Sequence, residues 1–322
     1  MREGGFTSSQ ENTITKRRSK MNSRKLQSYK MFLMILPLLV LVFLFSYFPL
    51  HGWAYAFFDY RPPFKLFDCE FVGFKWFSSL FSTAGKRAQI MDVMRNTFAM
   101  SGLSILFSWL PMAFAILMME INNRFFKRTV QTLTTLPNFI SWILLYSMAF
   151  FIFNSTGLVN RISIDMGLYE TPKLFLQMTD HVWLQMWLWS TWKGLGWSAI
   201  MYIAAIAGID QELYEAANVD GAGRFRSMWH ITIPGLLPTY FVLLLLNVAN
   251  FLNNGFEQYF VFENAFNKQW IQVLDLYVYN LGLGQGSYSL ATAISIMKSI
   301  ISLTLLFSVN TLSKVTRDEA IL

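Results

Sequence analysis

Residues 31–50 read MFLMILPLLVLVFLFSYFPL and contain no charged side chain. A helix needs roughly 20 apolar residues to cross the hydrocarbon core of a bilayer. Because backbone groups in lipid must satisfy their own hydrogen bonds, such a run folds as a helix. The run is too long for a signal peptide and lacks a small-residue cleavage site, although a cleaved presequence is the alternative. We therefore expect a first membrane-spanning helix here.

Composition extends this expectation to the whole chain. Hydrophobic residues make up 54% of the 322 residues and charged residues only 14%, whereas soluble proteins carry about 25% charged residues. The sequence thus predicts an all-α membrane protein with six transmembrane helices. The later spans are expected at roughly 96–119, 129–153, 183–207, 237–257 and 289–312. We interpret residues 1–28 as a disordered basic arm, 29–94 as the first transmembrane helix with an external loop, and 95–322 as the core domain.

The basic residues predict the orientation in the membrane. Lysine and arginine favour the cytoplasmic side of short flanking segments, and three segments are rich in them: the arm, the loop between the second and third spans, and the tail. With six spans these segments share one side, so both termini are expected in the cytoplasm. The net charge of +7 could also indicate nucleic acid, but the positions of the basic residues suit membrane orientation better, and no nucleic-acid partner is expected.

No residue pattern indicates catalysis. Cys69 is the single cysteine, and His51, His181 and His230 lie far apart in the sequence. A phosphate-binding GxxxxGK[ST] motif is absent. We therefore expect neither catalytic residues nor a metal site, and the chain is not expected to be an enzyme.

The loop at 208–236, between the fourth and fifth expected spans, has an unusual pattern. Residues 212–223 read ELYEAANVDGAG, which predicts a helix, a tight break at Gly221 and a second helix with Asp220 as its N-cap. Phe225 and Trp229 lie at helical spacing and give that helix one apolar face, and Pro234 is expected to end it. An amphipathic helix that rests on the bilayer is the alternative.

The same loop resembles that of a known family, the permease subunits of binding-protein-dependent ATP-binding cassette (ABC) importers. Their signature is Glu-Ala-Ala, three residues, Gly, nine residues, Ile, one residue and Leu-Pro. Here it reads Glu215-Ala216-Ala217, Gly221, Ile231 and Ile233-Pro234, with Ile in place of Leu. The resemblance covers roughly 95–320 and implies the type I ABC importer permease fold. It also implies contact with a separate ATPase through Glu215, Ala216, Ala217, Asp220, Gly221, Ala222, Phe225, Ile231 and Pro234.

The resemblance implies partners as well. The chain would form half of a pore with a second, homologous permease subunit, in the bacterial inner membrane among its lipids. A cytoplasmic ATPase dimer would bind ATP and Mg²⁺, so that this chain needs no cofactor itself, and an extracytoplasmic solute-binding protein would deliver cargo. A secondary transporter, which usually shows internal repeats, is the less consistent alternative.

Three stretches resemble the oligosaccharide branch of the family: 137–142 (PNFISW), 189–197 (WSTWKGLGW) and 247–254 (NVANFLNN). Sugars stack their C–H faces on aromatic rings and pair their hydroxyls with amides, which suits this mixture. Tryptophans as interface anchors and asparagines as ties between helices are the alternatives. By residue-level correspondence the cargo path would be lined by Ser141, Ser190, Lys193, Gly194, Trp197, Asn247 and Asn250.

Lys193 and Lys298 lie within the fourth and sixth expected spans. An ammonium inside a membrane is costly and marks a functional candidate, so these lysines would suit a uronate-containing cargo such as alginate or aldouronate. Alternatively, Lys193 pairs with Glu257 or a carbonyl, Lys298 extends to the interface, and the cargo is a neutral oligosaccharide.

Overall fold

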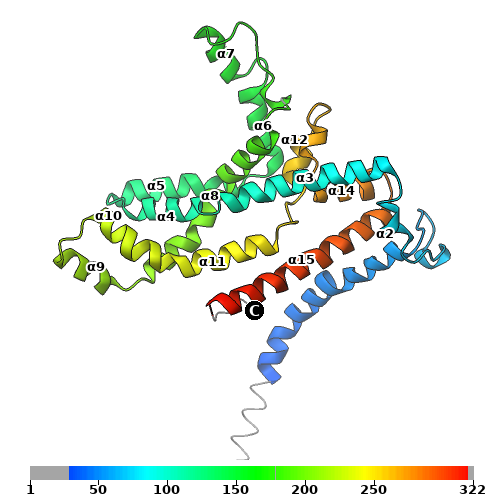
Figure 1. Ribbon diagram of the computed structural model, residues 1–322, viewed down its shortest axis with the longest axis horizontal. Helices are drawn as coiled ribbons and strands as arrows, with labels where there is room; N and C mark the ends of the chain where they lie inside the picture. The colour runs from blue at the N-terminus through cyan, green and yellow to red at the C-terminus, as the bar shows by residue number, and fades with distance from the viewer. Residues whose placement is uncertain (1–28, 178, 318–322) are drawn as a thin grey trace, which may run out of the picture. The chain divides into compact units, whose positions relative to one another are not determined.

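The computed structural model of this protein describes residues 29–177 and 179–317 (Figure 1). These residues form helices and connecting segments without a strand, apart from an isolated antiparallel bridge between Phe58 and Phe71. The expected arm at 1–28 lies outside the described residues. The chain divides into two compact units, Met1–Tyr55 and Ala56–Leu322, which we describe separately.

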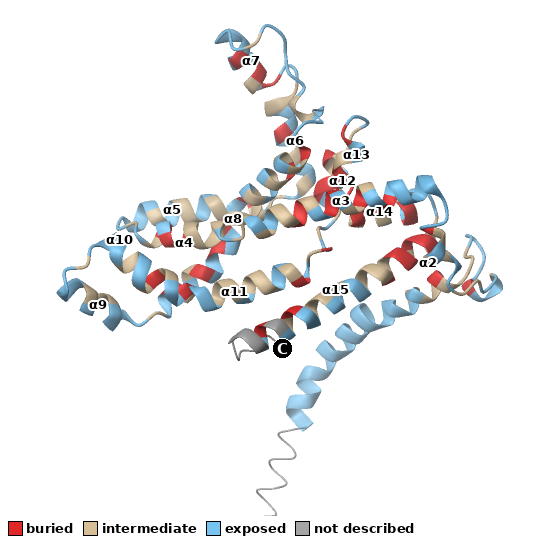
Figure 2. Ribbon diagram, in the orientation of Figure 1, coloured by how far each residue is buried: buried red, intermediate tan, exposed pale blue. Residues whose placement is uncertain are grey.

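The described part of the first unit is an apolar helix. It belongs to the candidate span Tyr29–Phe57, which includes a π-helical turn at Phe43–Tyr47 and continues as 3-10 helix from Phe48. Its leucine and phenylalanine side chains are exposed (Figure 2). Exposed apolar side chains on a helix of this length suit a lipid environment, and the helix predicted at 31–50 is confirmed.

The second unit is a series of helices joined by short turns. In chain order these are η3 (Leu66–Asp68), α2 (Lys75–Ser79), α3 (Ala84–Leu106), α4 (Leu110–Met119), α5 (Arg124–Thr135), η4 (Leu136–Phe139), α6 (Trp142–Phe153), α7 (Leu158–Asp165), η5 (Phe175–Gln177), α8 (Val182–Ala207), α9 (Gln211–Val219), α10 (Arg224–Ser227), η6 (Met228–Thr232), α11 (Ile233–Ala249), α12 (Glu257–Phe262), α13 (Lys268–Ile271), α14 (Leu274–Tyr279), η7 (Asn280–Gly284) and α15 (Tyr288–Arg317).

Five helices of the described residues are long and apolar enough to cross a membrane, and a sixth is reached if the bent pair α8 and α9 counts as one span. Besides Tyr29–Phe57, the spans are Ala84–Met119, Trp142–Asp165, Arg224–Ala249 and Tyr288–Thr311. Helix α8 packs against α3, α4, α5 and α11. Because it contacts other helices on several sides, it can carry polar and indole groups that a lipid-facing helix would lack. The predicted all-α membrane fold is confirmed.

One predicted span is wrong. The apolar run at 129–153 is not one helix but α5, the 3-10 turn η4 and α6. Pro137 lies in that turn, and proline both lacks an N–H and disfavours helix in the residue before it. Only α6, together with α7, forms a candidate span.

Two further boundaries differ from the sequence prediction. The span predicted at 237–257 begins at Arg224 and ends at Ala249, since Pro234 lies at the first turn of α11, where a missing N–H costs nothing. The prediction that Pro234 ends a helix is also wrong, because Pro234 lies in the first turn of α11. The boundary predicted between residues 94 and 95 falls inside α3.

Helix α8 approaches its neighbour closely at a glycine. Gly196 is buried, and a Cβ atom built on it would lie 2.4 Å from both the carbonyl carbon and the carbonyl oxygen of Thr134 near the end of α5. Real Cβ atoms do not come so close, so glycine is required for the two helices to meet here. On the same face, Ala199 is fully buried in a cluster with Ala115 of α4 and Leu236 of α11.

We predict that Gly196→Ala lowers the melting temperature of the purified protein in detergent, because overpacking costs about 1–3 kcal/mol. Gly194→Ala is the matched control, since a Cβ atom there meets nothing within 4 Å and alanine favours helix over glycine by roughly 0.5–1 kcal/mol. Equal melting temperatures for the two variants would contradict the close approach.

Candidate functional site

Helix α9, the turn after it and the start of the following helix form a hairpin, residues 210–229. The Asp210 carboxylate caps α9 by accepting a hydrogen bond from Glu212 N at 3.0 Å. The helix ends where Ala222 N donates to Ala217 O at 2.8 Å, and Gly221 between them has φ of +72°. Glycine adopts this left-handed conformation without the steric cost that other residues meet. The tight break predicted at Gly221 is confirmed.

The cap predicted for the second helix is wrong. Asp220 is the C-terminal cap of α9, and Gly223 is the N-cap of α10. The turn needs Gly221 after Asp220, and this places Asp220 on the end of the first helix. From α10 the chain continues through η6 into α11, and these three elements form one candidate span, Arg224–Ala249.

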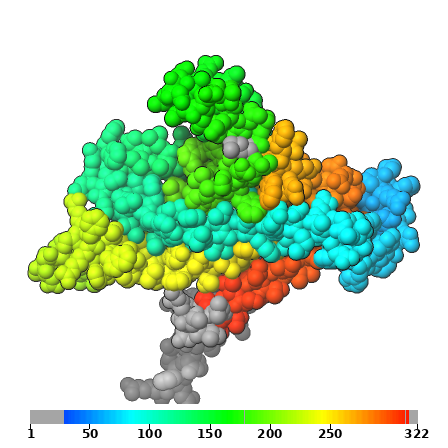
Figure 3. Space-filling model, turned by 45° about the horizontal axis from the view of Figure 1, so that its top comes forward, coloured from blue at the N-terminus to red at the C-terminus, as the bar shows by residue number. Residues whose placement is uncertain are grey.

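The hairpin exposes large apolar side chains. Val219 is 88% exposed, Phe225 83% and Trp229 66%. Figures 1 and 3 show this segment at one end of the second unit, where the start of α5, with Arg124, Lys127 and Arg128, also lies. The predicted residues 215–217, 220–222 and 225 lie together on the hairpin, while Ile231 and Pro234 lie on the following helix. Apolar side chains exposed in this way mark a contact surface.

Two contacts tie α9 to the helical segment that follows the hairpin. The hydroxyls of Tyr214 and Thr232 lie 2.9 Å apart and share a hydrogen bond, which joins α9 to η6. The side chain of Ile209, just before α9, lies against Gly235 of α11, where a Cβ atom would be 2.8 Å from Ile209 Cδ1. These two contacts connect α9 and the turn before it to η6 and α11.

A pocket of about 520 Å³ lies between α8, α11 and the break that separates α3 from α4. Its wall combines aromatic and small polar side chains, and Phe107 and Trp187 pack with ring centroids 4.4 Å apart. The described residues that line it are Ser104, Phe107, Ser108, Leu110, Pro111, Trp187, Ser190, Thr191, Gly194, Leu195, Trp197, Ser198, Met201, Tyr202, Leu243, Leu246 and Asn247. We call it the main pocket.

Most of the predicted path residues meet here. Ser190, Gly194, Trp197 and Asn247 line the main pocket. Asn250 lines a second, smaller pocket of about 230 Å³, which shares Ser104, Ser190 and Asn247 with the main one. Ser141 lies elsewhere and caps α6, where its hydroxyl accepts a hydrogen bond from Leu144 N at 3.4 Å.

Lys193 is not among the residues that line either pocket. Its ammonium donates to three backbone carbonyls of the broken span, those of Pro137 at 3.1 Å, Asn138 at 2.9 Å and Ile140 at 2.6 Å. It also lies 5.4 Å from the centre of the Trp142 ring. An ammonium has three N–H donors, so these carbonyls use all of them, and the alternative of a carbonyl partner for Lys193 is borne out.

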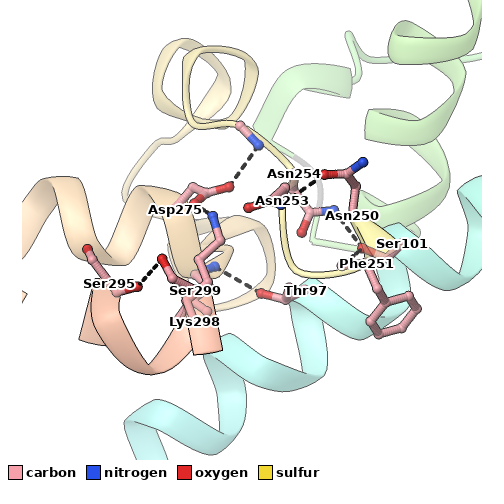
Figure 4. Close-up of polar contacts among 12 residues, drawn as sticks. Thr97, Ser101, Asn250, Phe251, Asn253, Asn254, Asp275, Ser295, Lys298 and Ser299 are labelled. Atoms are coloured by element: carbon pink, nitrogen blue, oxygen red, sulfur yellow. Dashed lines mark hydrogen bonds and ion pairs between the residues drawn. The ribbon is translucent and has the colours of Figure 1, made fainter. Parts of the chain in front are cut away.

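Lys298 has a different partner. Its ammonium forms an ion pair with the Asp275 carboxylate of α14, and both side chains are largely buried (Figure 4). The two lysines of the expected spans therefore each have partners within the chain. Nearby, burial together with the charge of Asp275 raises the pKa of the Tyr259 phenol, which keeps that hydroxyl neutral.

Sequence analysis missed one wall of the main pocket. Ser104 comes from the end of α3, Phe107 and Ser108 come from the break between α3 and α4, and Ser108 Oγ lies 3.1 Å from the Tyr240 hydroxyl. The signal was present, since two serines precede Pro111 in an otherwise apolar run. Within residues 29–177 and 179–317 no group of three or more His, Cys, Asp or Glu side chains could hold a metal ion.

Comparison with known proteins gives consistent results. Residues 114–317, more than half of the chain, match the family described as binding-protein-dependent transport system inner membrane component. The polygalacturonan/rhamnogalacturonan transport system permease protein YteP of Bacillus subtilis (strain 168) is 34% identical over 308 residues, which cover 95% of this chain and 94% of YteP. Protein LplB of the same organism is 37% identical over 293 residues, 90% of either chain.

Solved structures resemble the chain as well. Two crystal structures of a bacterial ABC transporter for the acidic polysaccharide alginate contain a chain that matches with a TM-score of 0.80. The identities are 29% and 30%, over 92% of this chain and 99% and 98% of theirs. One of them is in complex with a periplasmic protein that holds an alginate pentasaccharide.

We predict that Lys193→Met destabilises the purified protein more than the replacement of an exposed lysine by methionine does. Each hydrogen bond to a charged group contributes about 1.5–3 kcal/mol, and the carbonyls of Asn138 and Ile140 would lose the ammonium donor, while Pro137 O keeps its hydrogen bond from Ile140 N. The melting temperature in detergent measures the effect, with Lys173→Met, an exposed lysine of the loop before α8, as the control. A melting temperature equal to that of the control would contradict the structural role of Lys193.

Proposed function

Since this chain belongs to the family of binding-protein-dependent transport system inner membrane components, and is a permease of an ABC importer for oligosaccharides, we propose that it passes cargo through the main pocket. We propose further that it couples this passage to a separate ATPase through the hairpin 210–229. The exposed apolar side chains of that hairpin are the observation that carries the coupling proposal.

The hairpin has the properties of a docking element. It is short, capped at both ends and tied to α11, so that a force applied to it reaches the spans. Its exposed valine, phenylalanine and tryptophan would bury apolar area against a partner, at roughly 25 cal/mol per Å². ATP and Mg²⁺ would bind the partner and not this chain. The basic segments of the sequence support a cytoplasmic position for this end of the molecule and for both termini.

The main pocket suits a sugar. Its aromatic rings offer faces for C–H groups, while Ser190, Thr191 and Asn247 offer hydroxyls and an amide. A second, homologous permease subunit would complete the path, with a solute-binding protein on the outer side. Alternating access would follow, in which closure of the ATPase moves the hairpins and opens the pocket outward.

For the charge of the cargo, relatives and pocket favour different answers. YteP and the alginate transporter are named for polymers with acidic sugars, which favours a uronate-containing oligosaccharide. Among the described residues that line the main pocket there is no Lys, Arg, Asp or Glu, which favours a neutral oligosaccharide. We propose uronate-containing cargo, with amides and hydroxyls of this chain as donors to the carboxylates.

We predict that Gly221→Asp abolishes coupling while the protein stays in the membrane. Aspartate at φ of +72° is strained, and its carboxylate would stand unpaired in the docked interface. Transport by the reconstituted complex should fall about tenfold or more, within the range of coupling energies of 1–3 kcal/mol, and cargo should no longer stimulate ATP hydrolysis.

Gly167→Asp is the matched control for that experiment. Gly167 is exposed, has φ of +71° and lies in the loop between α7 and α8, which is expected outside. The backbone strain is therefore the same in the two variants, and only the location differs. Normal stimulation in Gly221→Asp, or equal losses in both variants, would contradict the coupling proposal.

The charge of the cargo can be tested with a matched pair of sugars. A uronate oligosaccharide and its carboxyl-reduced derivative have the same length and linkages, so that a comparison isolates the charge. We expect the uronate form to stimulate ATP hydrolysis by the wild-type complex more strongly. Lys193→Met should lower the response to both forms by one common factor, because the lysine holds backbone carbonyls. Selective loss of the uronate response would place Lys193 in the cargo path, and a stronger response to the reduced form would favour neutral cargo.

A further inference from the structure

Helix α5 begins with three basic side chains that have no acidic partner. Arg124, Lys127 and Arg128 all lie near its start, and none of them forms an ion pair within the part of the chain that the structure describes. Between residues 121 and 164 the sequence contains no Asp or Glu. The Lys127 ammonium donates to Met119 Sδ at 3.1 Å, and a thioether is a weak acceptor. The described residues therefore leave this positive charge uncompensated.

The helix itself gains nothing from these charges. Like charges three and four residues apart on a helix repel each other, and Arg124 has a basic residue at both spacings. Cations in a first turn also meet the positive end of the helix dipole. The start of α5 is already capped, since Asn123 Oδ1 accepts hydrogen bonds from Phe125 N at 3.0 Å and Phe126 N at 3.1 Å. The basic residues thus oppose the local fold, and a bound anion would relieve their repulsion.

Large apolar side chains stand beside these charges and point away from the rest of the unit. Phe125 is 80% exposed and Phe126 is 54% exposed, and Leu133 and Leu136 farther along are exposed as well. On its other side α5 packs against α8, where Thr134 meets the close approach described above. Exposed apolar side chains in this number mark contact with a membrane or with another protein.

Charge and apolar exposure follow each other along α5 as they do across one leaflet of a bilayer. The charges lie at 124–128, and residues 129–136 carry none. With 12 residues, α5 is about 18 Å long, and half of a hydrocarbon core is about 15 Å thick. When the basic start lies at the level of the headgroups, Leu133 and Leu136 therefore lie among the acyl chains. A water-soluble partner could reach the arginines but not these leucines.

An anionic phospholipid matches both features of this surface. Its phosphate supplies the negative charge that the described residues do not, and arginine donates to phosphate oxygens through paired N–H groups. Its acyl chains would cover the phenylalanines and leucines. The headgroup of a zwitterionic lipid carries a cation of its own, so that it offsets the basic residues less well. The cytoplasmic leaflet is the one rich in anionic lipid, and the basic segments of the sequence are expected on that side.

We propose that the start of α5 binds an anionic phospholipid of the cytoplasmic leaflet. Arg124 and Arg128 contact the headgroup, while Phe125 and Phe126 contact the acyl chains. We call these four residues the α5 lipid surface. None of them lines the main pocket or the smaller one, so that lipid binding here is independent of the passage of cargo. Because α5 leads into η4, whose carbonyls bond Lys193, a bound lipid stabilises the helix on one side of that junction.

Lipid titration of the purified full-length protein in a nonionic detergent tests this. The probe is phosphatidylglycerol, and phosphatidylcholine with the same acyl chains is the zwitterionic control. We expect phosphatidylglycerol to raise the melting temperature as its concentration increases, because a ligand that binds only the folded state stabilises it. Phosphatidylcholine should have a smaller effect. Arg124→Gln/Arg128→Gln should require about tenfold more phosphatidylglycerol for the same shift, since each basic residue adds to the attraction toward anionic lipid.

Lys86→Gln/Arg87→Gln is the matched control variant. It removes the same amount of charge from exposed positions at the start of another helix, α3, where the neighbours in sequence are Gly85 and Ala88. This variant should keep the wild-type response. Phe125→Gln/Phe126→Gln keeps every charge and should still weaken the response to phosphatidylglycerol, because the contact with the acyl chains is lost.

Folding of the arginine variant is checked without added lipid. Arg124→Gln/Arg128→Gln should then melt no lower than the wild type, because glutamine is a good helix former and the repulsion between basic side chains is reduced. A weaker lipid response in this variant therefore reports binding and not a folding defect.

Four outcomes overturn the proposal. Equal shifts with the two lipids remove the preference for an anionic headgroup. An unchanged response in Arg124→Gln/Arg128→Gln, or equal losses in this variant and in the α3 control, removes the surface. An equal shift with inorganic phosphate alone indicates a plain anion site in place of a lipid site. Finally, the complete importer is compared in nanodiscs of one lipid composition: if Arg124→Gln/Arg128→Gln no longer retains the ATPase subunit there, the surface belongs to that protein contact.

Discussion

Backbone carbonyls at a break between two helices need donors, and the arrangement of the second unit depends on how this chain supplies them. The turn η4 between α5 and α6 interrupts the helical hydrogen-bond pattern, and of the carbonyls there Pro137 O accepts a hydrogen bond from Ile140 N at 3.1 Å. Lys193 provides one ammonium for three of them. A single side chain thereby joins the central helix α8 to the broken span, and Gly196, one turn further along, brings the backbones of α8 and α5 into contact. The position of α8, and hence one wall of the main pocket, follows from this junction.

Backbone groups of other irregular segments are bonded by side chains that lie far away in the sequence. Asn96 of α3 donates to the carbonyls of Gln269 and Gln272 at 2.8 and 3.1 Å, which fixes the short helix α13. Thr97 accepts a hydrogen bond from Leu274 N at 2.9 Å and so fixes the start of α14. These connections act together with apolar packing, since Ile271, Val273 and Leu276 are fully buried in one hydrophobic cluster. The irregular segments between the spans are therefore held by particular hydrogen bonds as well as by apolar contact.

Hydropathy and the loop signature predict the fold class and the hairpin because both depend on residues close in sequence. Span lengths follow from apolar runs, and the turn at Gly221 follows from glycine at a helix end. Hydropathy does not register a break, however, so that it predicts 129–153 as one helix. The role of Lys193 depends on carbonyls more than fifty positions away, in a turn that the sequence does not reveal. Aspartate is a favoured N-cap residue, and Asp210 takes this position at the start of α9. Asp220 is the same residue type at the other end of that helix, so the preference alone does not distinguish the two positions.

The hairpin and the main pocket are joined by covalent structure and not only by contacts. Helix α8 runs from the pocket wall down to Ala207, and the segment Arg224–Ala249 runs back from the hairpin to Asn247 as one candidate span. At 1.5 Å per residue, the distance along that helix from Phe225 to Asn247 is about 33 Å. This helical segment is continuous, although it contains a π-helical turn at Met228–Thr232 and Pro238 inside α11. Because the Tyr214–Thr232 hydrogen bond ties α9 to the same segment, a displacement of the hairpin is passed along it to the wall formed by α11, while the junction at Lys193 holds α8 to the turn η4. Opposed walls, one attached to the hairpin and one anchored in the bundle, are what a pocket needs in order to open and close around its cargo.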